Sequence, residues 1–394
     1  MNRCEHIFCW SPLVCLWSSF FFCLPLTVLA DEWQTDLFQD SHESKAVTVT
    51  PTYFGEVFTN ARGGKTTKDA TQYQGLLDLE IGLDLERAGT GLPGSLFLLA
   101  QNTHGRGLTQ DFVGDTQVIS NIDSFENIMQ VGEYWWESRW LDDDVTVRLG
   151  KQDLNTEFQR IDGAALFIQS TFGLSPSTAF PTYPDQALGA VSRLHLLEAL
   201  QLKLGAWSAF ANGSSWGYSA SDSYLLVAEL ERAYSLLDSG LLGVFSLGAL
   251  YESDGEIDGQ PVSAVREYYL QWEQKIYRES TADEQREQGL AVFAGYYPRI
   301  SGEQIILESI GDSAVVGLTY RGLFSGRDND TLGLGVAWAE LYQGGTNQEV
   351  ATELFYRVNW SPHVSLQPDL QYISSPSGIY RDALVIGGRF EIRL

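Results

Sequence analysis

Acidic, basic and aromatic side chains gather between about residues 133 and 160 of this 394-residue chain, a combination suited to binding a polar solute. Carboxylates and guanidinium groups hydrogen-bond to vicinal hydroxyls, and an aromatic ring packs against an apolar ring face. A sugar presents both features. An ordinary solvated position explains each of these charges equally well. The candidate binding residues are Glu133, Trp135, Glu137, Arg139, Arg148, Asp153, Asn155, Glu157, Phe158 and Arg160.

Covalent and metal chemistry find little support in the sequence. All four cysteines lie within residues 4–23, and the histidines beyond them are widely spread with no G-x-S-x-G motif nearby. The string at 89–94 fits G-x-G-x-x-G, but no helix is predicted after it, so we interpret it as a turn. Residues 328–330 resemble a calcium loop that lacks its bidentate glutamate. We therefore predict no enzyme, no cofactor and no metal; a hydrolase would need a nucleophile beside a histidine.

Most of the chain alternates apolar and polar residues with a period of two, the pattern of a strand with two different faces. The clearest segment is 77–86, where leucine and isoleucine alternate with aspartate, glutamate and glycine. A helix of 3.6 residues per turn would not separate them. We predict an all-β fold of about sixteen strands, at residues 46–59, 72–87, 95–104, 127–141, 145–152, 188–196, 200–210, 223–233, 241–251, 265–277, 288–297, 313–321, 331–341, 351–360, 363–373 and 382–394.

One long apolar run, at about residues 13–30, follows Arg3 and precedes Asp31. This arrangement predicts a signal peptide over residues 1–30 and a mature domain over residues 31–394. A retained anchor helix is the alternative. No later segment approaches the roughly eighteen consecutive apolar residues that a spanning helix needs.

The alternation alone also fits a soluble β-sandwich, such as a lectin. Two features favour a membrane: connections alternate between short and long, and aromatic residues lie toward predicted strand ends. In lipid an open sheet edge leaves backbone groups unsatisfied, so the strands must close. We predict a closed antiparallel transmembrane β-barrel of about sixteen strands in the Gram-negative outer membrane. The aromatic residues are Trp136, Trp140, Trp272, Trp338, Trp360 and Tyr372.

The longest connection, at about residues 153–187, is rich in phenylalanine and proline and too apolar for a solvated tail. We expect it to be an external loop that folds into the barrel and narrows a water-filled channel. The alternative is a loop packed over the mouth. The turns at 142–144 and 361–363 are then periplasmic, and the inward polar faces of the strands line water.

The formal net charge of −26 makes nucleic acid an unsuitable partner and disfavours anionic solutes. Neutral polar solutes and cations remain. A constriction ring that carries both acidic and basic groups would moderate ion flow while favouring polyols.

Several blocks of sequence resemble the OprB family of carbohydrate-selective porins. They are LGKQDLNTEF (149–158), STFGLSP (170–176), YPDQALGA (183–190), GLTYRGLFSGRDNDTLGLGVAWAEL (317–341) and LQPDLQYISSPSG (366–378). The resemblance implies a sixteen-stranded barrel through which mono- and disaccharides diffuse. A general or cation-preferring porin without sugar selectivity is the alternative.

The resemblance also implies particular residues and partners. Lys151, Asp153, Asn155, Glu157 and Phe158 would lie at or near the constriction, although Lys151 has the parity of the lipid-facing residues and fits the rim equally well. The partners would be small sugars as solutes, membrane lipid and lipopolysaccharide around the wall, and the barrel-assembly machinery. The terminal residue is leucine, where the family usually has phenylalanine. The oligomeric state is left open, a homo-oligomer included.

Overall fold

The computed structural model describes residues 45–394, apart from 178–179, 210–212, 214, 219–222, 237–239, 258–259, 263, 280–287, 302–309 and 343–344. The signal peptide predicted at residues 1–30 lies outside the described residues. Within the described ranges, no helix combines the length and the apolar character needed to cross a bilayer.

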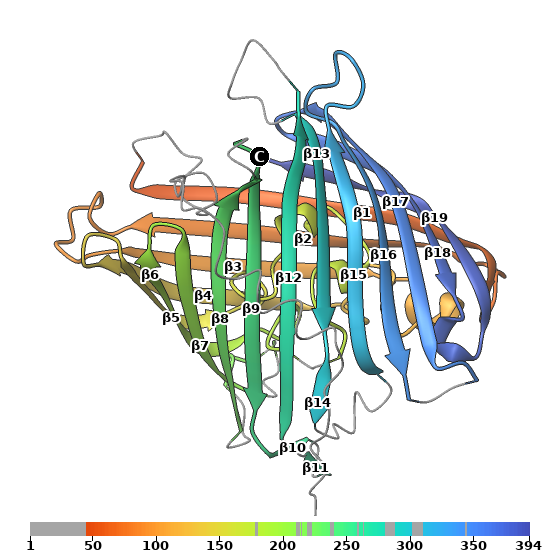
Figure 1. Ribbon diagram of the computed structural model, residues 1–394, viewed down its shortest axis with the longest axis horizontal. Helices are drawn as coiled ribbons and strands as arrows, with labels where there is room; N and C mark the ends of the chain where they lie inside the picture. Colours follow the sequence, from red (N-terminus) through yellow and green to blue (C-terminus); the bar gives the residue numbers. More distant parts are fainter. Residues whose placement is uncertain are drawn as a thin grey trace, which may run out of the picture.

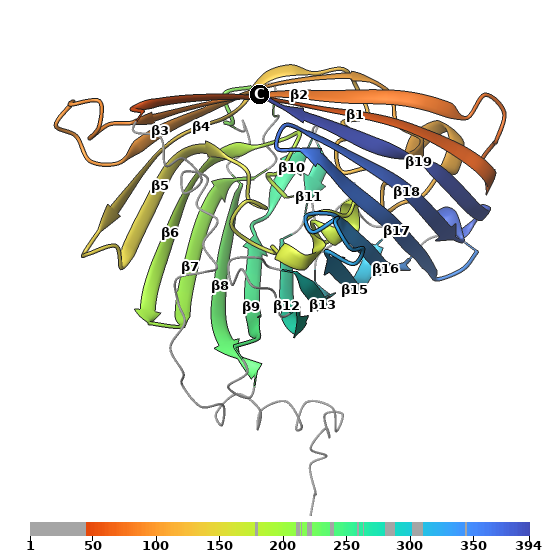
Figure 2. The same cartoon turned by 90° about the horizontal axis from the view of Figure 1, so that it is seen from above.

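In the described part of the chain, sixteen long strands form one antiparallel sheet in which β1 pairs with both β2 and β19. The sheet therefore closes into a barrel, as predicted (Figures 1 and 2). The long strands are β1 (Val47–Gly64), β2 (Thr71–Asp84), β3 (Ser95–Gly105), β4 (Met129–Trp140), β5 (Val145–Gln152), β6 (Ala187–Leu197), β7 (Leu200–Ser208), β8 (Tyr224–Ser235), β9 (Leu242–Glu252), β12 (Val265–Arg278), β13 (Gly289–Tyr297), β15 (Ile310–Arg321), β16 (Thr331–Leu341), β17 (Gln348–Ser361), β18 (Val364–Ser374) and β19 (Arg381–Arg393).

Three short strands add to this frame. β10 (Gly255–Ile257) and β11 (Gln260–Val262) form a small hairpin of their own, and β14 (Arg299–Ser301) pairs with β12. Antiparallel order places the connections at 141–144 and 362–363 on the rim where the described chain begins and ends. The long connections at 106–128 and 153–186 lie on the opposite rim, which we call the loop rim.

The two faces of the wall are inverted relative to a soluble protein. Leu354 pairs directly with Leu370 on the outer face, and both are exposed. One residue along, Glu353 pairs with Gln371 on the inner face, and both are 0% exposed. Because successive side chains of a strand point to opposite faces, the period of two separates hydrocarbon-facing residues from interior residues.

Exposed aromatic residues lie toward both rims, as expected of belts at the two membrane interfaces. Trp140 and Trp360 are exposed near one rim, and Tyr372 is exposed near the loop rim. Trp272 departs from the prediction, because it lies in the middle of β12. Its indole N–H donates to the hydroxyl of Tyr234 at 2.6 Å, which satisfies the polar group on the outer wall.

The connection at 153–186, which we call the inner loop, folds into the barrel as predicted (Figure 2). Its phenylalanines pack against phenylalanines of the wall: Phe167 stacks on Phe172 at 4.2 Å between ring centroids and meets Phe355 edge-on at 4.9 Å. Gly335 on β16 makes room for them, because a Cβ there would lie 2.6–2.7 Å from both rings of the loop. The apolar contact fixes the inner loop against one side of the barrel.

Carboxylates of the wall bind the backbone of the inward-folded loops. Glu353 accepts the N–H groups of Ile168 and Gln169, both at 2.8 Å. Glu349 accepts the N–H groups of Thr116 and Gln117 at 2.9 Å. The expectation that the inward polar faces line water is therefore wrong at these positions, because the loops cover them and need the carboxylates as acceptors for backbone donors.

We expect Glu353→Ala to loosen the inner loop without preventing closure of the barrel. The change leaves two buried N–H groups without an acceptor, and each such group costs about 1–3 kcal/mol. The wall keeps its own backbone ladder. The folded band on a temperature-series gel should therefore convert to the unfolded band at a lower temperature than in the wild type.

Thr352→Ala, on the other face of the same strand, is the matched control and should convert at the wild-type temperature. Equal conversion temperatures for the two variants would contradict the anchoring role of Glu353.

Candidate functional site

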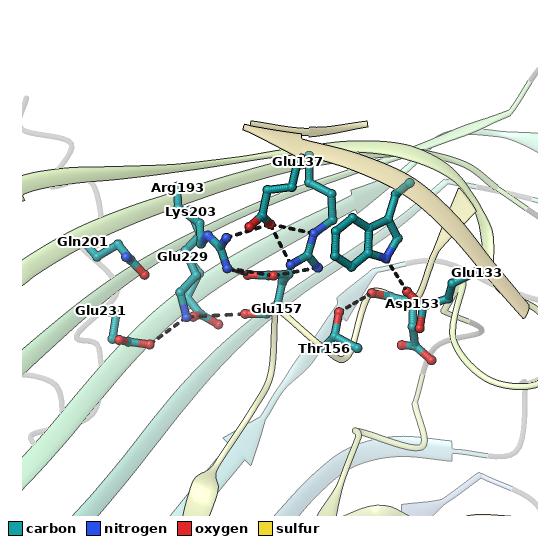
Figure 3. Close-up of polar contacts among 12 residues, drawn as sticks. Glu133, Glu137, Asp153, Thr156, Glu157, Arg193, Gln201, Lys203, Glu229 and Glu231 are labelled. Atoms are coloured by element: carbon teal, nitrogen blue, oxygen red, sulfur yellow. Dashed lines mark hydrogen bonds and ion pairs between the residues drawn. The ribbon is translucent and has the colours of Figure 1, made fainter. Parts of the chain in front are cut away.

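Four charged residues from three adjacent strands and the inner loop form a compact cluster (Figure 3). Arg148 on β5 binds Glu137 on β4 at 2.7 Å and Glu157 of the inner loop at 2.9 Å. Arg193 on β6 binds the same two carboxylates, at 2.8 and 3.1 Å. Each carboxylate thus lies between two guanidinium groups, so the cluster joins the wall to the loop.

The cluster continues along the wall through Lys203 on β7. Its ammonium binds Glu229 at 3.0 Å and Glu231 at 2.7 Å, both on β8. Arg193, Lys203 and Glu229 are direct cross-strand partners. The wall therefore carries three cations on three successive strands: Arg148 on β5, Arg193 on β6 and Lys203 on β7. We call these three residues the basic ladder.

The ring of Trp135 packs against Arg148 of the basic ladder. The guanidinium carbon of Arg148 lies 4.2 Å from its ring centroid, and Phe97 stacks on it at 4.8 Å. Its indole N–H donates to Glu133 at 3.1 Å. Because only 3% of Trp135 is exposed, it offers no open face to a sugar, and the structure corrects that expectation. A covered tryptophan orients Arg148 instead.

Asp153 and Asn155 hold the inner loop together. The Asp153 carboxylate accepts the N–H groups of Asn155 at 2.7 Å and Tyr183 at 2.8 Å, so it joins the beginning of the loop to its return. The Asn155 carboxamide donates to the carbonyl oxygens of Phe158 at 3.1 Å and Gly173 at 2.8 Å. The Phe158 ring is fully buried. These residues shape the loop that carries Glu157.

Arg139 and Arg160 are not among the four residues of the cluster, although Arg160 is near enough to help lower the pKa of Glu157. Arg139 is exposed near the end of β4, at the rim opposite the loop rim. Arg160 lies further along the inner loop and binds Asp162 at 2.8 Å, with 43% of its side chain exposed. In the described part of the chain, no group of three or more His, Cys, Asp or Glu side chains could hold a metal ion.

Comparison with known proteins decides the family. The model of the carbohydrate-selective porin, OprB family, matches residues 68–394. The chain belongs to this family. Porin B of Pseudomonas aeruginosa is 21% identical over 397 residues, with 86% of each chain covered. The putative porin QuiX of Acinetobacter baylyi is 21% identical over 400 residues, with 88% of each covered.

Solved structures agree on the fold. OprB of Pseudomonas putida at high pH superposes with a TM-score of 0.76 at 18% identity, covering 89% of this chain and 94% of that one. The low-pH structure of the same protein gives a TM-score of 0.60, with 89% and 93% covered. Family and fold together indicate an outer-membrane channel.

In this member of the OprB family, sequence reasoning missed Arg193, Lys203, Glu229 and Glu231. All four lie in predicted strands, and a signal was present: Lys203 is a single charge between Leu202 and Leu204. Such a lysine must point inward if its neighbours face lipid. What the alternation did not reveal is the register that sets these residues side by side.

Opposing effects act on two carboxylates of the inner loop, Glu157 and Asp153. Burial by itself raises the pKa of Glu157, but Arg148, Arg193 and Lys203 outweigh burial and hold the pKa below its ordinary value. Burial also raises the pKa of Asp153, and its hydrogen bonds only partly offset that rise. Glu157 is therefore firmly anionic, which keeps the wall and the loop bound to each other.

The lowered pKa of Glu157 predicts how the channel responds to acid. The stabilisation from its ion pairs is present above the pKa of an unfolded glutamate, about 4.3, and is lost as pH falls through the lower folded-state pKa. We expect single-channel conductance to show no step assignable to Glu157 between pH 7 and about 5, and a step in more acidic solution.

Glu157→Gln, which cannot ionise, should lack the acidic step. A step near neutral pH that Glu157→Gln abolishes would be inconsistent with these ion pairs.

Proposed function

We propose that this porin passes mono- and disaccharides by diffusion and that the basic ladder, with Glu137, Glu157 and Glu231, forms the constriction that selects them. The observation that carries the proposal is three cations on successive strands, each bound to carboxylates, two of them to Glu157 of the inner loop. Arg193, Lys203 and Glu231 keep 15%, 12% and 28% of their side chains exposed, so they are the members that a solute would touch.

The chemistry of such a ladder suits polyols better than ions. Guanidinium and ammonium groups donate, and carboxylates accept, so alternating charges present both kinds of partner along one wall. A sugar hydroxyl donates and accepts at the same time. An inorganic ion meets nearby charges of both signs, which reduces the attraction of the ladder for either.

The large negative net charge of the chain is weak support for a cation-preferring porin. Several wall glutamates are buried and bind loop groups, Glu353 and Glu349 among them. Glu267 likewise accepts the Gln159 carboxamide at 2.8 Å and is 0% exposed. Because these carboxylates are covered by loop groups, a passing ion does not touch them, and net charge alone does not identify the solute.

Planar-bilayer conductance with added glucose, together with liposome swelling in sugars, tests the proposal. We expect glucose to reduce the current in a saturable way and sugars to cause swelling. Unblocked current at high sugar without swelling would overturn sugar selectivity. A large reversal potential in a salt gradient, with no discrimination among sugars, would identify a cation porin instead.

Arg193→Ala should weaken glucose block by about tenfold or more, since a hydrogen bond to a charged group contributes about 1.5–3 kcal/mol. Arg148 still pairs with Glu137 and Glu157, so the barrel should fold normally. Arg87→Ala is the matched control, because Arg87 is an exposed arginine in the connection between β2 and β3. Equal glucose block in both variants would exclude Arg193 from the site.

A further inference from the structure

Lys151 lies on the outer face of the wall and yet is 0% exposed. It follows the lipid-facing Val147 and Leu149 on β5, with the same parity. Part of the connection between β7 and β8 covers it. We call the described residues of this cover, Gly213 and Ser215 to Tyr218, the outer strap.

The Lys151 ammonium uses all three of its donors on backbone oxygens. It donates to the carbonyl groups of Gly213 at 2.5 Å and Ser215 at 3.1 Å in the outer strap, and to Val131 of β4 at 2.6 Å. An ammonium group has three donors and no acceptor, so its hydrogen-bonding capacity is filled. The lysine thus binds the strap to the wall.

Further contacts seat the strap at the same place. The hydroxyl of Tyr134 donates to the Trp216 carbonyl at 2.8 Å, and the N–H of Leu188 donates to the Gly217 carbonyl at 2.7 Å. Gly217 has φ of +79°, and a Cβ there would lie 2.8 Å from the Lys151 side chain. Glycine at this position lets the backbone lie directly on the lysine.

The strap also reaches the inner loop. The N–H of Gly213 donates to the Asp185 carboxylate at 2.8 Å. Asp185 lies on the return of the inner loop, two residues after Tyr183, whose N–H donates to Asp153 at 2.8 Å. Asp153 in turn holds the beginning of the loop. A continuous set of contacts therefore runs from Lys151, through Gly213 and Asp185, to the segment that carries Glu157.

We infer that Lys151 is a positioning residue that sets the inner loop from the opposite side of the wall. The lysine fixes the outer strap, the strap fixes Asp185, and Asp185 fixes the return of the inner loop. The sugar-binding part of this inference rests on the proposed function, whereas its effect on the open channel does not.

Lys151→Met tests the inference in planar bilayers, because methionine fills similar space without the three donors. We expect noisier open-channel current in plain salt and a loss of glucose affinity of about threefold to tenfold, the range expected when coupling passes through packed intermediates. Lys151→Arg, which keeps the charge and donors, should recover part of the affinity. Lys68→Met, at an exposed lysine between β1 and β2, is the matched control and should behave as the wild type.

Asp185→Ala provides a second break in the same set of contacts, because alanine offers no acceptor to the Gly213 N–H. It should shift noise and affinity in the same direction as Lys151→Met, and the double variant should lose less than the sum of the two single losses. If Lys151→Met yields no folded band on a gel, Asp185→Ala decides: a change in noise supports the inference, and wild-type noise overturns it.

The outcomes separate this inference from the proposed function. If glucose does not block the wild-type channel, the proposed function is wrong. The positioning role of Lys151 is then tested by the open-channel noise alone. Wild-type noise and wild-type glucose affinity in a folded Lys151→Met barrel would overturn the positioning role.

Discussion

Backbone N–H groups of loops folded inside a barrel must find acceptors, and this requirement organises the interior of the molecule. The wall supplies those acceptors as carboxylates: Glu353 and Glu349 each bind two consecutive N–H groups of a loop. Phenylalanine packing adds area to the same contact but no direction. The carboxylates determine where each loop lies, and the position of the loop determines which wall charges remain accessible to solute.

The same requirement changes the meaning of the acidic composition. In a soluble protein, excess carboxylate is mostly solvated surface, whereas here a share of it lies buried inside the barrel. The cluster around the basic ladder is different, because its carboxylates bind side-chain cations and parts of it stay accessible. Carboxylates of the wall therefore have two roles. Some accept hydrogen bonds from loop backbone, and others form ion pairs with the basic ladder.

Sequence alone predicts the frame well because each strand separates lipid from interior, and the period of two records that separation residue by residue. The strands are accessible in this way, and the apolar composition of the phenylalanine-rich loop predicts that it folds inward. The contacts made across the barrel are not. Glu353 has an inward parity in the sequence, but nothing in the alternation indicates that Ile168, far away along the chain, lies against it.

In the candidate site too, the sequence predicts what is local and misses what the fold brings together. Glu137, Arg148 and Glu157 were predicted because they are near one another in sequence, and Arg193 and Lys203 were missed because register alone brings them close. Lys151 was correctly expected to share the parity of the lipid-facing residues, while its cover was not foreseen. The strap has no periodic pattern, so only the folded chain reveals its contact with the lysine.

The covered position of Trp135 affects how quickly a bound solute could leave the channel. An exposed indole would hold a pyranose face through dispersion and hydrophobic contact. The sugar would lose the whole of that contact in one step when it leaves. Hydrogen bonds to charged side chains exchange one at a time with water, so a solute can leave in small steps. Conduction needs occupancy that is favourable but brief. At the proposed constriction, a Trp135 covered by Arg148 would therefore favour flux over retention.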